Sequence, residues 1–211
     1  MNMGISTSGG FVRSFSGHTL GGVASLQYDQ DWANEKRTRD SFRINGGEVE
    51  KSDGGTVESL TRTIQLSGIV ELGFEFGQAH KFATTTLLLR NTDDETSQFV
   101  GTNADERSDV RVTRLRWVER ELFTQQVRGE HDLSTLDVNW HYGFSLADRI
   151  EPNRRISQYD RGIGTEEAFG LSSKPEGNRR FYSDLDDVSH EVALSLKYDF
   201  DHVDEKAPAT Y

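Results

Sequence analysis

The sequence predicts an all-β fold: an antiparallel, up-and-down sheet that forms part of a transmembrane β-barrel, with about six to eight strands. Three observations lead to this prediction. Several segments alternate apolar and polar residues over long stretches, as expected of strands with two unlike faces. The connections between these segments alternate between short and long. Aromatic residues gather near the ends of the apolar stripes, where a membrane-spanning strand meets the lipid headgroups.

The clearest strand is predicted over residues 136–146. One of its faces carries Leu136, Val138, Trp140, Tyr142, Phe144 and Leu146. The other face carries Asp137, Asn139, His141, Gly143 and Ser145. Strict alternation of this kind requires something to cover the apolar face, and either a soluble core or a lipid bilayer would do so.

Further strands are predicted in order at residues 20–32, 60–76, 82–89, 109–127 and 188–200. The faces of residues 82–89 cannot be assigned, because Thr84, Thr85 and Thr86 suit either side. Arginines blur the alternation of residues 109–127, so a helix over residues 117–128 is the competing prediction there. Residues 1–19 are rich in Gly and Ser and are expected to be flexible or to form a short strand.

The connections divide into two kinds. Residues 77–81 and 129–134 are predicted short turns. Long polar segments are predicted as external loops at residues 33–56, 91–108 and 147–187, although residues 42–44 also suit a strand extension. The predicted organisation is therefore a barrel segment at residues 20–200, followed by a polar tail at residues 201–211.

Composition supports a membrane barrel and excludes several classes of function. Only 34% of the 211 residues are apolar, and the mean hydropathy is −0.67, both low for a soluble globular protein. A transmembrane barrel explains this, because it is apolar only in a narrow outer band. A net charge of −11 disfavours nucleic acid as a partner. The absence of cysteine excludes thiolate catalysis.

The manner of membrane crossing also follows from the sequence. No apolar run approaches the roughly 20 residues of a membrane helix, so any crossing must be by strands. The first residues lack the apolar core of a signal peptide, which leads us to expect a fragment, a mature form or a protein that is not exported. The predicted interfacial aromatic residues are Trp32, Phe74, Phe76, Trp140, Tyr142, Phe144, Tyr198 and Phe200. In the alternative, a soluble β-sandwich, the same residues would form the inner core.

Several stretches resemble the barrel domain of TonB-dependent outer-membrane receptors. In that family a strand rich in aromatics and Arg runs into a short turn similar to Gly129–His131. The next strand ends in an Arg-x-Glu-Pro-x-Arg-Arg element, here Arg149–Arg155, and a tyrosine follows, here Tyr159. The stretches that carry the resemblance are residues 73–101, 115–134, 136–160 and 178–187. It covers residues 57–200 well and residues 1–56 loosely.

The resemblance implies energised uptake of a ferric siderophore or similar bulky nutrient across the bacterial outer membrane. Membrane lipid, lipopolysaccharide and an anionic metal chelate would be the partners. TonB would be reached only through the plug domain, and we identify no plug in this sequence. The family barrel has 22 strands, and six or seven are countable here. We therefore expect a segment of a receptor barrel that would transport nothing alone.

A set of arginines and one tyrosine provides the candidate ligand contacts. The set is Arg149, Arg154, Arg155, Tyr159, Arg161, Arg179 and Arg180, all in or beside the predicted loop at residues 147–187. Guanidinium groups bind carboxylates and phosphates in a bidentate manner, so these residues could hold an anionic chelate or contact lipopolysaccharide phosphate. The alternative is pairing with acidic residues, either with Glu151, Asp160, Asp184 and Asp186, which would stiffen the loop, or with carboxylates on neighbouring strands.

No catalytic or metal site is predicted. None of the six histidines pairs with another at a ligand-like spacing, and His131 is expected to make a structural hydrogen bond in its turn. His141 and Asp137 share the polar face, where a polar network is favoured over acid–base catalysis. The acidic clusters at residues 93–95 and 184–187 match no calcium loop. We therefore predict no enzyme activity, no cofactor and no metal.

Two other functions stay open on the sequence. The chain could be a small self-contained outer-membrane barrel that acts as an adhesin or a passive pore. It could also be a soluble β-sandwich that binds carbohydrate or protein. Stability in buffer without detergent would favour the sandwich over either membrane protein.

Overall fold

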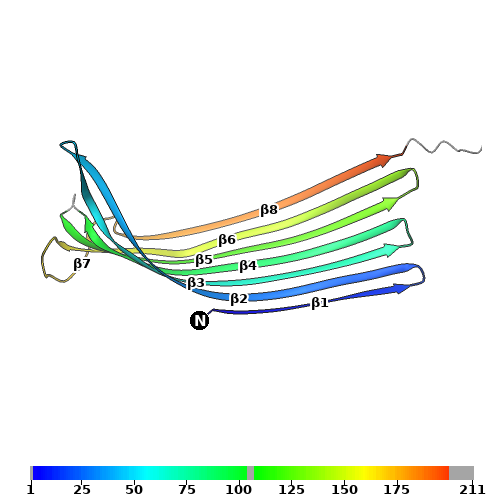
Figure 1. Ribbon diagram of the computed structural model, residues 1–211, viewed down its shortest axis with the longest axis horizontal. Coiled ribbons are helices and arrows are strands. Elements are labelled where there is room, and N and C mark those ends of the chain that lie inside the picture. The colour runs from blue at the N-terminus through cyan, green and yellow to red at the C-terminus, as the bar shows by residue number, and fades with distance from the viewer. Residues whose placement is uncertain (1, 104–106, 200–211) are drawn as a thin grey trace, which may run out of the picture.

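The computed structural model describes residues 2–103 and 107–199 and consists of one eight-stranded sheet (Figure 1). Its strands are β1 (Met3–Phe15), β2 (His18–Asn45), β3 (Glu48–Phe76), β4 (His80–Asn103), β5 (Ser108–Asp132), β6 (Leu136–Gly162), β7 (Gly170–Leu171) and β8 (Asn178–Tyr198). In these residues no helix is long and apolar enough to cross a membrane.

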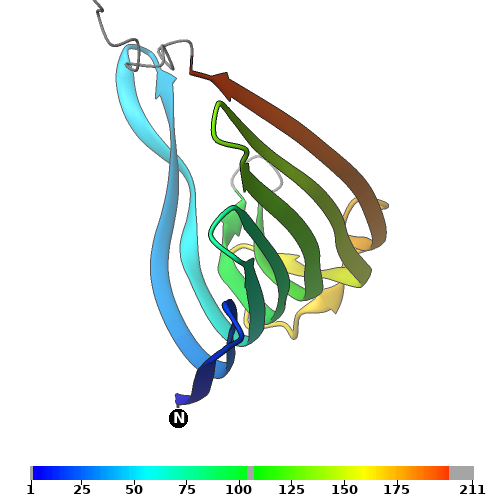
Figure 2. The same ribbon diagram turned by 90° about the vertical axis from the view of Figure 1, so that its right-hand side faces the viewer.

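The sheet is an antiparallel meander. Strands β1 to β6 each pair with the next strand in sequence, and both β8 and the short β7 pair with β6. The prediction of an all-β, antiparallel, up-and-down sheet is confirmed. Viewed end-on, the sheet curves, and its edge strands β1 and β8 lie apart (Figure 2). Within the described ranges these two strands do not pair, so the sheet is open.

The segment predicted as the first long loop, residues 33–56, is instead strand. β2 and β3 stay paired to Asn45 and Glu48, around a tight turn at Gly46 and Gly47, both of which have positive φ. The resulting hairpin arm extends well away from the rest of the sheet (Figure 1). A polar segment can continue a strand because the backbone ladder supplies the hydrogen bonds, and cross-strand charges such as Lys36 with Glu58 (2.7 Å) add to it.

The other two predicted loops are also largely strand. β4 continues to Asn103, and β6 continues to Gly162, so the irregular part of residues 147–187 is confined to the neighbourhood of β7. Residues 117–128 are strand and not helix, because the arginines of β5 alternate towards acidic partners on neighbouring strands. Residues 3–15 form the full strand β1. The tail predicted at residues 201–211 lies outside the described residues.

A β-bulge interrupts β6 at the Glu-Pro element. Between Glu151 and Arg154, β6 advances three residues while β8 advances two, from Ser183 to Phe181. Proline has no N–H for the ladder, so Pro152 in a central strand requires such an irregularity. The extra residue shifts the alternation by one position. As a consequence, Glu151 and Arg154 lie on the same face of the sheet.

The sheet is a single layer with almost no apolar core. Among the described residues only two apolar side chains, Val110 and Val118, are buried. Both lie on the same face as the buried residues Ser59, Ser97 and Glu151. Side chains are expected to crowd together on the inner side of a curved sheet. Apolar residues on the opposite face are partly or largely exposed, with Val192 at 77%. A sheet of this kind requires a cover for one face.

A pair of glycines allows β3 and β4 to approach each other closely, in the part of the sheet away from the short turns. Gly55 lies opposite Gly101, and a Cβ on Gly55 would lie 2.6 Å from the Gly101 Cα.

We expect Gly55→Ala to lower the free energy of unfolding in detergent micelles by about 1–3 kcal/mol, because the strands must separate. Gly9→Ala is the control, since no atom lies within 4 Å of its Cβ position. Equal denaturant midpoints for both variants would contradict the close approach.

Candidate functional site

Strand register sorts the side chains into two continuous faces. Residues directly opposite each other in neighbouring strands point to the same side. The row nearest the short turns therefore joins seven residues on one face: Phe15, His18, Phe76, His80, His131, Val138 and Leu196. Successive rows extend this face along the strands, and the intervening residues form the opposite face.

The face that includes this row carries an apolar band. Its members include Leu20, Leu26, Val70, Leu72, Leu88, Phe123, Val127, Leu146, Val192 and Leu194, which register places on the same face. On β4 to β8 the band stops at one row of charged residues: Arg90, Glu121, Asp148 and Asp186. This charged row limits the apolar band to part of the length of these strands.

The predicted interfacial aromatics fall mostly near the edges of this band. Phe74, Phe76, Trp140 and Tyr198 lie at the short-turn edge, and Trp32 lies beyond the far edge. Tyr142 and Phe144 lie further inside, on successive rows. Phe200 lies outside the described residues.

The structure adds Trp117 to this set, which the sequence analysis missed. Register places it in one row with Trp32, through Arg62 and Asp94, and the Arg62 guanidinium lies 5.5 Å from the Trp32 ring. From Leu20 to Trp32 is about 40 Å along a strand. The available signal in the sequence was that Trp117 shares the odd-numbered positions of β5 with other apolar residues. The arginines beside it obscured this alternation.

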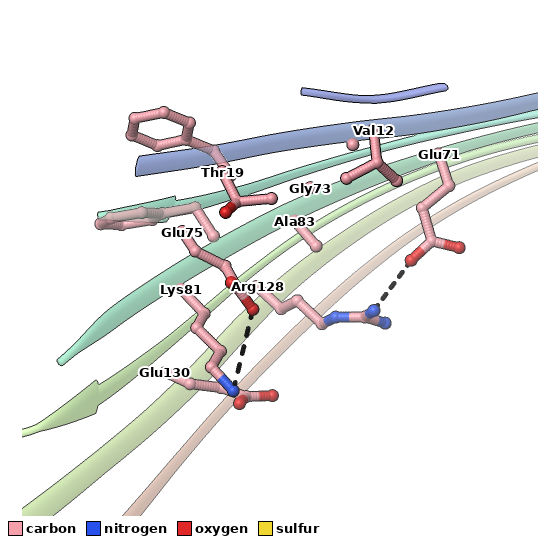
Figure 3. A pocket seen from close by; sticks show the side chains of 12 residues that line it. Val12, Thr19, Glu71, Gly73, Glu75, Lys81, Ala83, Arg128 and Glu130 are labelled. Atoms are coloured by element: carbon pink, nitrogen blue, oxygen red, sulfur yellow. Dashed lines mark hydrogen bonds and ion pairs between the residues drawn. The ribbon is translucent and has the colours of Figure 1, made fainter. Parts of the chain in front are cut away.

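The opposite face is polar, and its short-turn end carries an ion cluster made of Glu71, Glu75, Lys81, Arg128 and Glu130 (Figure 3). Arg128 Nη2 donates to Glu71 Oε1 at 2.8 Å, and Lys81 Nζ lies 3.9 Å from Glu75 Oε1. These side chains border a hollow of about 290 Å³. They are about half exposed, so their pairing adds little stability and leaves them available to another polar surface.

Farther along the same face, Glu151 gathers three arginines. Arg149 Nη2 donates to its Oε2 at 2.8 Å, Arg116 Nε donates to its Oε1 at 3.2 Å, and Arg154 Nε lies 3.6 Å away. Glu151 is 3% exposed. Its burial acts to raise the pKa of the carboxyl, but the hydrogen bonds from Arg149 and Arg116 and the nearby positive charges outweigh burial, so the pKa is lowered. The site is a carboxylate that stays ionised and holds cations together.

The bulge divides the predicted ligand contacts between the two faces. Arg149, Arg154 and Arg179 lie on the polar face, where Arg154 and Arg179 both stack on Phe181, at 4.4 and 5.6 Å. Arg155, Tyr159, Arg161 and Arg180 lie on the opposite face, beyond the apolar band. The seven residues therefore do not form one site.

The candidate ligand contacts on the face that carries the apolar band have partners of their own. Arg161 Nε donates to Asp109 Oδ2 at 3.2 Å and lies over the Phe169 ring. The Arg111 guanidinium lies 4.9 Å from the Tyr159 ring. Pairing with acids, the alternative to ligand contact, is found for Arg149 and Arg154 with Glu151. It is also found for Arg161, whose partner Asp109 lies on the neighbouring strand β5.

Two histidines that the sequence analysis treated as isolated meet on the apolar face. His80 Nδ1 and His131 Nδ1 lie 3.0 Å apart, and Trp140 Nε1 donates to His131 Nε2 at 3.0 Å. Because an indole N–H can only donate, neutral His131 carries its proton on Nδ1 and donates it to His80. This arrangement joins β4, β5 and β6 beside the short turns. His141 pairs with Glu191 at 3.2 Å and not with Asp137.

In the described ranges no group of three or more His, Asp or Glu side chains is arranged to hold a metal ion. No protein-family model and no curated protein sequence matches the chain.

The Glu151 cluster yields a stability prediction. Glu151→Gln leaves Arg116, Arg149 and Arg154 close together without their shared anion. We expect the free energy of unfolding in micelles to fall by about 1–3 kcal/mol, because each hydrogen bond to a charged group is lost or weakened. Glu48→Gln, at the exposed tip of the β2–β3 arm, is the matched control and should change little. Identical losses in both variants would sink the central role of Glu151.

The same carboxylate predicts a pH dependence. The pKa of Glu151 is lowered in the folded protein, so the folded state favours the ionised form. Its contribution is complete above the ordinary pKa of 4.5 and is lost as the pH falls through the folded value. The difference in unfolding free energy between wild type and Glu151→Gln should therefore shrink below about pH 4.5. A difference that stays constant to pH 3 would argue against this assignment.

Proposed function

We propose that the chain forms part of the barrel wall of a TonB-dependent outer-membrane receptor that takes up a ferric siderophore or similar bulky nutrient. One observation carries the proposal. A continuous apolar band, edged by aromatic residues and, on β4 to β8, by one charged row, runs across one face of the single-layer sheet. A lipid bilayer of about 25 Å apolar thickness fits such a band.

A soluble β-sandwich is less well supported. Its apolar face would be covered by a second sheet, and the described residues form only one sheet. Strands of a sandwich also have no reason to continue far beyond their apolar stretch. Here β2 and β3 extend well past it as a polar arm (Figure 1). Polar extensions on one side and tight turns on the other are typical of outer-membrane barrels.

A small self-contained adhesin or pore is also less well supported. Of the described strands, seven are long enough to cross a bilayer, since β7 has 2 residues and the next shortest, β1, has 13. Single-chain bacterial barrels have an even number of strands and at least eight. The open edges at β1 and β8 therefore suit a wall that further strands complete.

The receptor assignment rests on the resemblance around Arg149–Arg155 and on the distribution of arginines. In a barrel the polar face would line the lumen, where Arg149, Arg154 and Arg179 could meet an anionic metal chelate. Arg155, Arg161 and Arg180 would face outward beyond the band, at the level of lipopolysaccharide phosphates. The plug that gates such a barrel and contacts TonB is a separate domain of the family.

Tryptophan depth measures the membrane arrangement directly. All three tryptophans, Trp32, Trp117 and Trp140, lie on the apolar face near its edges. In single-tryptophan variants reconstituted in vesicles, we expect stronger fluorescence quenching by lipids brominated near the headgroup than by lipids brominated near the chain ends. Strong quenching by aqueous iodide, with none by either lipid, would overturn the membrane proposal.

The transport half of the proposal has its own test. Deleting the gene in the source bacterium should abolish accumulation of one radiolabelled ferric chelate, and dissipating the proton-motive force in wild-type cells should do the same. Unchanged uptake of every chelate that wild-type cells accumulate would contradict a receptor role while leaving the membrane arrangement intact.

A further inference from the structure

A second hollow opens on the polar face, on the side of the apolar band away from the short turns. Its volume is about 570 Å³, and residues of five neighbouring strands, β2 to β6, line it. Three of its lining residues are arginines, Arg37, Arg39 and Arg114, and its apolar lining includes Phe99, Val112 and Ile156. Three cations beside an apolar surface are unexpected in a chain of net charge −11.

The arginines are only partly neutralised. Arg114 pairs with Glu95, but Glu95 also lies 3.8 Å from Arg116. Arg37 lies 4.0 Å from the carboxylate of Glu35, too far for a hydrogen bond. Arg39 lies 6.0 Å over the Phe99 ring, and among the described residues it makes no ion pair.

The acidic residue of the lining does not offset this charge. Asp40 is held by Lys51 at 2.7 Å, which leaves the hollow with an excess of positive charge. An excess of guanidinium groups at a concave surface attracts anions.

Two buried polar atoms beside the hollow have no partner. Ser59 Oγ and Arg114 Nε are both inaccessible to solvent and make no hydrogen bond. They belong to one cross-strand row, because Ser59 lies opposite Ser97 and Ser97 lies opposite Arg114. Both atoms are closed to a bound molecule as well as to water, whereas the Arg114 side chain as a whole is 39% exposed and can meet a ligand in the hollow.

We propose that this hollow binds an organic anion that has a carboxylate or similar acidic head and a flat apolar body. The head would meet Arg37, Arg39 and Arg114. The body would pack on Phe99, Val112 and Ile156, as aromatic rings do against apolar walls. The biological meaning rests on the proposed function: the hollow lies on the lumen face beyond the membrane band, where an incoming substrate would first be held.

The test uses 1-hydroxy-2-naphthoate as a fluorescent probe of the full chain in micelles of a nonionic detergent. We expect saturable binding to wild type and an affinity lowered about tenfold or more by Arg39→Gln, the arginine whose loss breaks no ion pair of the described residues. Arg39→Lys should recover part of the affinity. Arg13→Gln is the matched control, because Arg13 lies opposite Leu20 on the other face of the sheet. The neutral analogue 2-naphthylmethanol, which also enters micelles, should show no difference among the variants.

Equal probe binding by wild type, Arg39→Gln and Arg13→Gln would overturn the proposal, as would the absence of saturable binding to folded wild type. Weakened binding at higher ionic strength supports it, because screening reduces attraction between exposed charges. The result is separable from the membrane assignment. The hollow can bind the probe even if tryptophan quenching places no residue in lipid, and an empty hollow leaves the quenching pattern unchanged.

Discussion

Cross-strand register is the constraint on which the rest of this structure depends. A shift by one residue in any pairing would turn every side chain of that strand to the other face. The observed pairing brings Leu20, Phe74, Phe82 and Trp140 into one row, with their apolar neighbours in successive rows. The same pairing brings Glu71, Arg128 and Glu151 onto the opposite face. Two unlike surfaces therefore follow from one set of backbone hydrogen bonds.

The fold class was predictable because alternation is a local property of each strand. The strand lengths were not. Charged segments such as Lys36–Glu58 look like loops in sequence, since a loop and a solvent-exposed strand contain the same residue types, and only pairing with a neighbour distinguishes them. Trp117 and the His80–His131 contact escaped for the same reason. Their significance depends on which residue lies opposite, and register between distant segments cannot be obtained from either segment alone.

The candidate arginines show how a single backbone irregularity reorganises a surface. Sequence places Arg154 and Arg155 side by side, yet the bulge at Pro152 directs Arg154 towards Glu151 and Arg155 to the other face. Removing a carboxylate from water is unfavourable unless cations replace the lost hydration. Burial of Glu151 therefore requires arginines from β5 and β6 together, which links the bulge to its neighbours.

The open edges of the sheet bear on how such a chain could enter a bilayer. Along β1 and β8, backbone N–H and C=O groups within the apolar band have hydrogen-bonding partners on one side only among the described strands. Water satisfies the other side in solution, but hydrocarbon cannot, and each unsatisfied group costs several kcal/mol there. On the proposed membrane assignment, insertion is thus thermodynamically tied to edge pairing. On that assignment, a chain with unpaired edges would stay at the membrane surface, where water satisfies those groups.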